Sequence, residues 1–171
     1  AGASVRVLLV GQPRLPHQVE LLRELKVPTT ETSTTDDWNR LEHPGQVVID
    51  AMLGIGAEPP LARAPAAAAT WLSHYDVLVV SLDLPSGVGP DLGLQGSCVT
   101  ADVTVAMGRP SLATREPVVQ AYLGDLYLAD VGLPDAAWEQ AGAKLAPRGV
   151  FAEGPLVRLS APDRPSDAAT P

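Results

Sequence analysis

VLVVSLDLPSG, at residues 77–87, decides the fold that this sequence predicts. The stretch begins as a run of aliphatic residues and ends abruptly at Asp83, Pro85 and Gly87. A short apolar run that is closed by turn residues is typical of a buried strand. Because strands of parallel sheets are covered on both faces, such a continuous apolar run indicates a central strand of an α/β domain.

The segments on either side of this stretch alternate between strand and helix patterns in the first half of the chain. Alternation of this kind favours right-handed crossovers and therefore a parallel sheet with helices on its faces. The predicted fold class is α/β, a three-layer sandwich with a mainly parallel central sheet. Further strands are predicted at 5–10, 27–31 (an edge strand), 47–54, 101–108 and 125–132, and helices at 15–26, 61–75 and 135–145, with a short helix ending at Leu41.

The length and composition describe one globular domain. A chain of 171 residues can bury one hydrophobic core but is short for two ordinary domains. Aromatic residues make up only 4% of the chain, so aliphatic side chains must form most of the core. After about residue 145 the sequence loses its periodicity and is rich in Pro, Arg, Asp and Ala. We therefore expect an α/β domain over residues 1–145 and a flexible tail over 146–171.

Charge and cysteine content exclude several classes of function. The formal net charge is −8, and no dense run of Lys or Arg is present, so neither nucleic acid nor an anionic membrane surface is an expected partner. No apolar stretch approaches the roughly 20 residues that span a bilayer, and no signal-peptide pattern opens the chain, which predicts a cytoplasmic location. The single cysteine, Cys98, excludes an internal disulfide and is read as a small core residue.

Two acidic residues follow predicted strands at the sheet edge where ligands bind. In open parallel sheets this edge lies beyond the carboxyl ends of the strands. Asp50 ends the run VVID and Asp83 ends VLVVSLD. Because a buried carboxylate is costly without a partner, we expect both residues to face one crevice together with Ser86. Oxygen ligands of this kind suit a hard cation.

Each of these features also has a purely structural interpretation. An Asp after a strand is more often a turn or N-cap residue than a catalyst. The G-I-G element, at Gly54 and Gly56, allows close approach of a ligand but lacks the full G-x-G-x-x-G pattern. The three histidines have no metal-ligand spacing and are interpreted as surface residues.

Four motifs in a fixed order resemble the YjeF N-terminal family, the NAD(P)H-hydrate epimerases. They are VVIDAMLGIG from residue 47, VVSLDLPSGVGPDLG from residue 79, CVTADVTVAMGRP from residue 98, and GDLYLADVGLP from residue 124. The corresponding family patterns are D-A-x-x-G-x-G, D-x-P-S-G, A-D-x-T-V and a closing D-I-G-(I/L)-P. The resemblance covers about residues 5–135, and the P-S-G turn is its most specific part.

The resemblance implies a dimeric, Rossmann-like, cytoplasmic enzyme of metabolite repair. Such domains interconvert the R and S forms of the hydrated cofactors NADHX and NADPHX, a small-molecule nucleotide substrate, and bind potassium. By the motif match, Asp50 and Ser86 are potassium ligands and Asp83 contacts the ligand. Asp50 is also the acid or base, because epimerisation requires proton transfer at the hydroxyl of the hydrated ring. The nucleotide loop is formed by Gly54, Ile55, Gly56, Ala57 and Glu58.

The chain also departs from the family pattern. It has no match to the N-N-G-G-D-G phosphate loop, whose Asn completes the cation site, and the resemblance starts at the family's second strand. We therefore expect the domain to be N-terminally incomplete relative to the family. Where the family carries A-P-K, this chain has Arg109 within GRPS. Two alternatives stay open: a non-catalytic binding module or degenerate relative of the family, and an unrelated doubly wound domain of the flavodoxin or receiver type.

Overall fold

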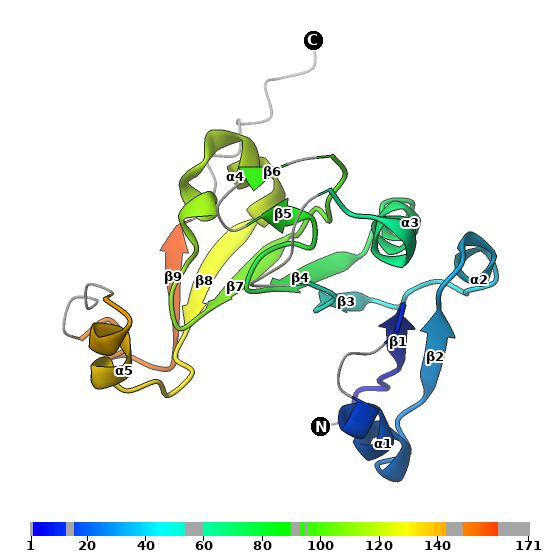
Figure 1. Cartoon of the computed structure of the whole chain (residues 1–171), viewed down its shortest axis with the longest axis horizontal. Coiled ribbons are helices and arrows are strands. Elements are labelled where there is room, and N and C mark those ends of the chain that lie inside the picture. Colours follow the sequence, from blue (N-terminus) through cyan, green and yellow to red (C-terminus); the bar gives the residue numbers. More distant parts are fainter. Residues whose placement is uncertain are drawn as a thin grey trace.

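A five-stranded, mainly parallel sheet forms the centre of the molecule (Figure 1). The structure is a computed structural model that describes residues 2–12, 16–53, 60–89, 93–94, 96–142 and 149–160. The strand order is β3-β4-β7-β8-β9, and only β9 runs antiparallel to its neighbour β8. The strands are β3 (Val47–Asp50), β4 (Leu78–Leu82), β7 (Val103–Met107), β8 (Asp125–Ala129) and β9 (Leu156–Ser160).

Two helices cover one face of this sheet, α3 (Arg63–Leu72) and α4 (Pro117–Leu123) (Figure 1). The alanine-rich α3 can approach the strands closely, because Ala68 and Ala69 leave room for Val79 against the helix. α4 begins with Pro117 at its first turn, where a missing N–H is tolerated. The core therefore lies between these helices and the sheet.

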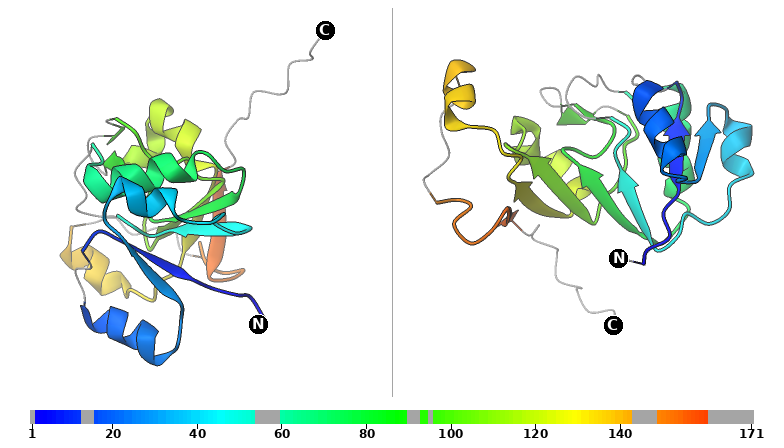
Figure 2. Two further views of the ribbon diagram at one scale, coloured as in Figure 1. Left: turned by 90° about the vertical axis from the view of Figure 1, so that its right-hand side faces the viewer. Right: turned by 90° about the horizontal axis from the view of Figure 1, so that it is seen from below.

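The opposite face of the sheet carries large apolar side chains that are exposed. The register places Val47, Ile49 and Leu78 on this face, since Asp50 pairs with Ser81 and successive side chains alternate between faces. Each of these three side chains is about half exposed or more. Figure 2, in its right-hand view, looks onto the molecule from this side.

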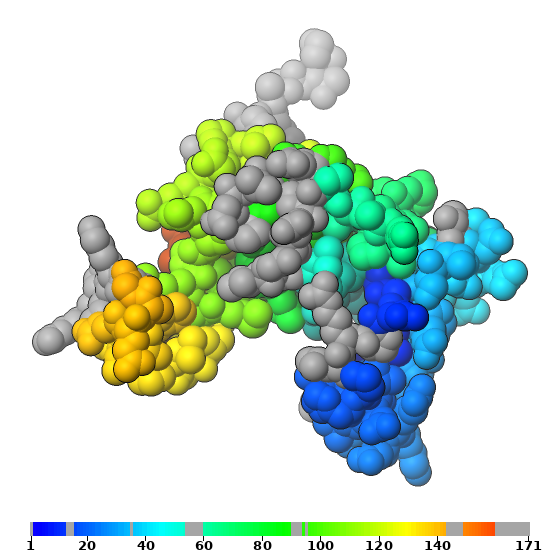
Figure 3. All heavy atoms as spheres, in the orientation of Figure 1, coloured from blue at the N-terminus to red at the C-terminus, as the bar shows by residue number. Residues whose placement is uncertain are grey.

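The N-terminal segment forms a smaller parallel pair, β1 (Val7–Val10) and β2 (Thr29–Thr32), joined through α1 (Pro16–Glu24). Leu8 and Val10 of β1 pack against the core cluster under α3, which attaches this unit to the main sheet. In the space-filling view it projects on one side of the molecule, and α5 (Asp135–Gln140) projects on the other (Figure 3).

The short helix α2 (Thr35–Asn39) begins with a capping box. The Thr34 side chain accepts a hydrogen bond from the Asp37 amide, and Asp37 accepts one from the Thr34 amide in return. The Ser33 amide, which donates to the same carboxylate oxygen at 2.9 Å, and the Thr34 amide lower the pKa of the exposed Asp37 carboxyl, because both hydrogen bonds favour its charged form. A short β5 (Val88–Gly89) and β6 (Gly93–Leu94) form an antiparallel pair, and a 3-10 helix spans Leu112–Arg115.

The predicted α/β class with a mainly parallel central sheet is confirmed. The predicted strands correspond to β1, β2, β3, β4, β7 and β8, and the predicted helices to α1, α2, α3 and α5. Five elements were not predicted: α4, β9, the short strands β5 and β6, and the 3-10 helix. α4 contains Val118 and Val119, which are weak helix formers, and its helical state depends on burying Val119 and Leu123. β9 lies inside the segment 146–171, for which we predicted a flexible tail, and forms because its residues pair with the edge of β8.

None of the helices among the described residues is long and apolar enough to cross a membrane.

Candidate functional site

Asp50 is a buried carboxylate with four hydrogen-bond donors around it. It stands at the carboxyl end of β3 and is 3% exposed. Its Oδ2 accepts from the Ser81 hydroxyl at 2.9 Å and from the Ser86 amide at 2.8 Å. Its Oδ1 accepts from the Ser86 hydroxyl at 2.6 Å and, at a long 3.4 Å, from the Met52 amide. These donors offset the cost of burying the charged group.

The turn after β4 carries Ser86 to this carboxylate. The Ser86 hydroxyl donates to Asp50 and accepts a hydrogen bond from the Leu53 amide at 3.1 Å, so the segment after β3 is tied to the turn after β4. Gly87 follows with a φ of 108°. A Cβ at Gly87 would lie 2.6 Å from the Cβ of Cys98, so only glycine fits here without movement. Of the three residues predicted to share one crevice, Asp50, Asp83 and Ser86, the structure shows contact between Asp50 and Ser86.

Asp83 begins the same turn and is also buried, at 5% exposure. Its φ of 69° places it in the left-handed region, where Asp is one of the few tolerated residues. Its amide donates to the carbonyl of Val105 on β7 at 2.8 Å, which fixes the turn to the neighbouring strand. A strained residue held in place by a buried turn is a frequent feature of binding sites.

Cys98 lies against Gly87 of the same turn. It is partly buried, and its neighbour Val99 donates its amide to the Ser86 carbonyl at 2.9 Å. Burial and, to a smaller extent, the Asp50 charge raise the pKa of the Cys98 thiol to about 11. The thiol is therefore protonated near neutral pH, consistent with the core role that the sequence predicted.

The predicted nucleotide loop, Gly54, Ile55, Gly56, Ala57 and Glu58, lies outside the described residues. The described part of the chain contains no group of three or more His, Cys, Asp or Glu side chains that could hold a metal ion. For a potassium ion the relevant donors are instead hard oxygens. Asp50 Oδ1 and Ser86 Oγ, which lie 2.6 Å apart, are oxygens of that kind and are close enough to contact one ion.

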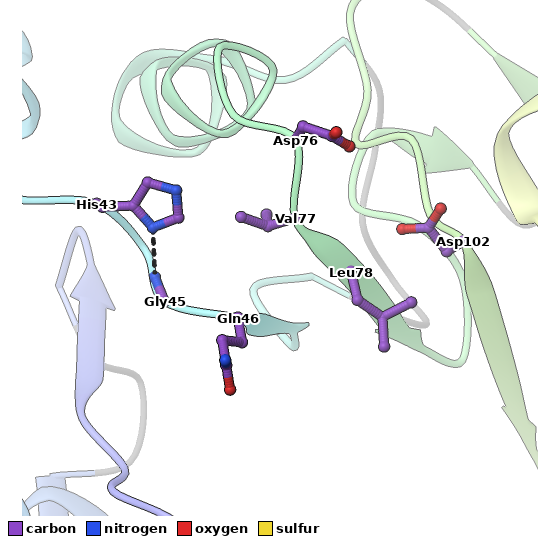
Figure 4. Close-up of a pocket in the computed structure, with 7 residues that line it drawn as sticks. All are labelled: His43, Gly45, Gln46, Asp76, Val77, Leu78 and Asp102. Carbon is purple, nitrogen blue, oxygen red and sulfur yellow. Dashed lines mark hydrogen bonds between the residues drawn. The ribbon is translucent and has the colours of Figure 1, made fainter.

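An open cavity of about 470 Å³ lies at the opposite end of the strands (Figure 4). His43, Gln46, Asp76 and Asp102 are among its lining residues, and the His43 ring accepts a hydrogen bond from the Gly45 amide at 3.1 Å. These residues precede β3, β4 and β7, so the cavity is at the amino ends of the strands. Ligands of open α/β sheets bind at the other end, where Asp50 and Ser86 are.

Two residues whose side chains make hydrogen bonds between neighbouring strands were not singled out from the sequence. Ser81 interrupts an otherwise aliphatic strand. A buried polar residue at such a position needs a hydrogen-bond partner, and this interruption could have identified Ser81 from the sequence. Asp102 accepts a hydrogen bond from the Val79 amide at 2.8 Å and donates its own amide to the Val79 carbonyl at 2.9 Å. It fixes the start of β7 to β4 and has a structural role at the amino ends of these strands.

Comparison with known proteins gives related sequences over most of the chain. Residues 1–113 match the family described as YjeF-related protein N-terminus. The chain is 33% identical over 119 residues to an NAD(P)H-hydrate epimerase of Dehalogenimonas lykanthroporepellens, which covers 69% of this chain and 46% of that protein. It is 29% identical over 136 residues to an NAD(P)H-hydrate epimerase of Limosilactobacillus reuteri, covering 76% and 61%.

A longer relative and a solved structure are also similar to this chain. The bifunctional NAD(P)H-hydrate repair enzyme Nnr of Archaeoglobus fulgidus is 29% identical over 140 residues, which cover 79% of this chain and 28% of that protein. The chain thus spans less than two thirds of the length of each of these three relatives. The crystal structure of yeast ynu0 (YNL200c) superposes with a TM-score of 0.69 at 16% identity, covering 92% of this chain and 78% of the yeast chain, so the two share a fold.

Proposed function

This chain belongs to the family of YjeF-related protein N-terminal domains, and on that basis we propose that it is an NAD(P)H-hydrate epimerase domain that interconverts the R and S forms of NADHX and NADPHX. The observation that carries the proposal is the contact between Asp50 and Ser86, which joins two separate family motifs at the ligand-binding edge of the sheet. Two relatives, which align with 69% and 76% of this chain, are named as epimerases.

Asp50 is the proposed acid–base residue. Inversion of the hydrated ring carbon requires its C–O bond to break and to re-form on the opposite face. The carboxyl group can protonate the hydroxyl, which leaves as water while the electron pair of the ring nitrogen forms a C=N bond, and can then take a proton from the water that adds to the opposite face. Both hydrogen-bonded contacts of Oδ2 are short, whereas Oδ1 has one short contact, with the Ser86 hydroxyl. The reacting oxygen in this proposal is therefore Oδ1.

Asp50 and Ser86 are also the proposed ligands of a potassium ion. When bound, the ion supplies positive charge that holds anionic groups of the substrate near the sheet edge. The two adjacent oxygens are Asp50 Oδ1 and Ser86 Oγ, and in this proposal the ion and the reacting proton both use Oδ1, because Oδ2 already accepts two short hydrogen bonds. Other groups must complete the coordination shell. In the same proposal Asp83 and the loop Gly54, Ile55, Gly56, Ala57 and Glu58 contact the nucleotide. Replacing potassium by tetramethylammonium should lower the rate, and an unchanged rate would remove the ion from the proposal.

Two further properties complete the proposal. We place the protein in the cytoplasm, with one small-molecule nucleotide substrate, and we propose that it forms a homodimer. Sedimentation equilibrium of the purified chain tests the dimer, and a single species of monomer mass at micromolar concentration would exclude it. Cell fractionation tests the location.

The experiment that tests the activity measures the conversion of R-NADPHX by the purified chain in the presence of potassium and an excess of an S-specific dehydratase. We expect turnover above the spontaneous rate for the wild type and for Asp76→Asn, an exposed carboxylate at the other end of the strands. Asp50→Asn should reduce turnover to the spontaneous rate. No turnover with a folded wild-type chain would reject the epimerase function for this chain and favour a binding module.

A further inference from the structure

We infer that Ser81 is a positioning residue that determines which oxygen of Asp50 is available for chemistry, an inference that rests on the function proposed above. Ser81 lies on β4 directly beside Asp50 on β3, because the parallel register pairs these two residues. The Ser81 side chain is fully buried, and its hydroxyl donates to Asp50 Oδ2 at 2.9 Å. It acts through Asp50 and has no proposed contact with substrate.

The two short hydrogen bonds to Oδ2 use both of its lone pairs. One comes from the Ser81 hydroxyl and the other from the Ser86 amide. A carboxylate oxygen accepts about two such bonds, so Oδ2 has no remaining capacity. Oδ1 keeps one short bond, from the Ser86 hydroxyl, since the Met52 contact at 3.4 Å is at the limit of a hydrogen bond. The carboxylate cannot rotate without losing the Ser81 bond.

The neighbouring strand shows that a buried hydroxyl at this level of the sheet can be satisfied without a carboxylate. Thr104 on β7 pairs in register with Ser81 and is equally buried. Its hydroxyl donates to the Leu123 carbonyl at 2.7 Å, a purely structural bond to the end of α4. Thr104 is therefore a matched control, because it is a buried hydroxyl in the same layer with no contact to Asp50.

The test compares Ser81→Ala with Thr104→Val in the full chain, by kinetics and by amide hydrogen exchange. The reporter amides are Ser86, which donates to Oδ2, and Leu53, which donates to the Ser86 hydroxyl. For Ser81→Ala we expect kcat to fall about tenfold with KM unchanged, because a misplaced acid–base group affects the reacting step. Exchange at both reporter amides should become faster. Thr104→Val should lower the melting temperature but leave kcat and both amides unchanged.

The two readouts separate the failure of this inference from the failure of the proposed function. If the wild type has no epimerase activity, the proposed function is lost, and amide exchange alone decides whether Ser81 holds Asp50. If Ser81→Ala leaves exchange at Ser86 and Leu53 unchanged, the inference is wrong whatever the activity. If exchange becomes faster but kcat keeps its wild-type value, Ser81 holds the turn without positioning a reacting oxygen, and the inference is again wrong.

Discussion

Asp50 and Ser86, 36 positions apart in the sequence, make a two-point contact in which the Ser86 amide donates to Oδ2 and the Ser86 hydroxyl to Oδ1. The contact joins the end of β3 to the turn after β4, and both residues are almost completely buried. A carboxylate held by both of its oxygens is fixed in orientation as well as in position. This geometry holds the Asp50 carboxylate in a fixed position at the edge of the sheet.

The first prediction concerns the hydroxyl of this contact. Ser86→Ala removes the donor to Asp50 Oδ1 and the acceptor of the Leu53 amide, both in a buried setting. We expect the free energy of unfolding to fall by about 1–3 kcal/mol, because buried polar groups lose their partners. Urea denaturation measures the change. Ser73→Ala, which removes an exposed hydroxyl bonded to the Thr70 carbonyl, is the control and should change stability by less than about 0.5 kcal/mol.

A second prediction addresses the glycine that follows. Gly87→Ala puts a Cβ within 2.8 Å of the backbone of Ser97 and Cys98, at a φ of 108°. The clash and the unfavourable φ together should destabilise the fold by about 3 kcal/mol or more. Gly142→Ala is matched, since its φ of 72° is also positive but its Cβ would meet nothing within 4 Å. That variant should lose only about 1 kcal/mol in thermal or urea unfolding. Equal losses in the two variants would contradict the clash.

The sequence predicted the parts of this site that depend on local pattern. An aliphatic run that ends in a turn is visible without any knowledge of the fold, and the carboxyl ends of parallel strands meet at one edge, so the meeting of Asp50 and Ser86 followed. The partner of Ser81 did not follow, because it depends on the register between β3 and β4, which no local pattern specifies.

Non-local contacts also explain two of the elements that were missed, β9 and α4. β9 forms by pairing with the edge of β8. A short strand that depends on pairing with a strand distant in the sequence has only a weak local pattern, and the residues that precede β9 include several Pro and Gly. α4 contains two adjacent β-branched residues, so its propensity is low and packing against the turn after β4 determines its structure. In both cases tertiary contacts outweigh local preference.

The third prediction tests the structural role of Asp102. Asp102→Ala leaves the Val79 amide without its acceptor at the start of β4, so we expect a loss of about 1–3 kcal/mol in unfolding free energy. Asp102→Asn keeps a side-chain oxygen as acceptor and should lose less. Epimerase activity measured below the unfolding transition should be unchanged in both variants, because this residue lies at the amino ends of the strands. A specific fall in kcat with normal stability would contradict a purely structural role.

A fourth prediction contrasts the two faces of the sheet. Leu126 is buried at 6% exposure among Ala106 and Leu128, whereas Ile49 is 64% exposed on the opposite face. Leu126→Ala should therefore cost about 2–5 kcal/mol through lost contacts and a cavity. Ile49→Ala removes a side chain that is largely in water and should change stability by less than about 1 kcal/mol. Urea denaturation of the isolated chain measures both changes. A large loss for Ile49→Ala would show that this face is buried in solution.

The last prediction uses the raised pKa of Cys98. Burial, and secondarily the Asp50 charge, raise the pKa of the thiol from 9.0 to about 11, so at pH 8 the folded protein has roughly a hundredfold less thiolate than an unperturbed cysteine. Alkylation by iodoacetamide should be correspondingly slow in buffer and fast in urea, and the single cysteine makes the readout unambiguous. The pKa of the thiol is higher in the folded protein than in the unfolded chain. The free energy of unfolding is therefore unaffected by Cys98 ionisation below pH 9 and falls as the pH rises towards 11, because the unfolded chain loses the thiol proton more readily. Rapid alkylation of the folded chain at pH 8 would show that the thiol is not held in this environment.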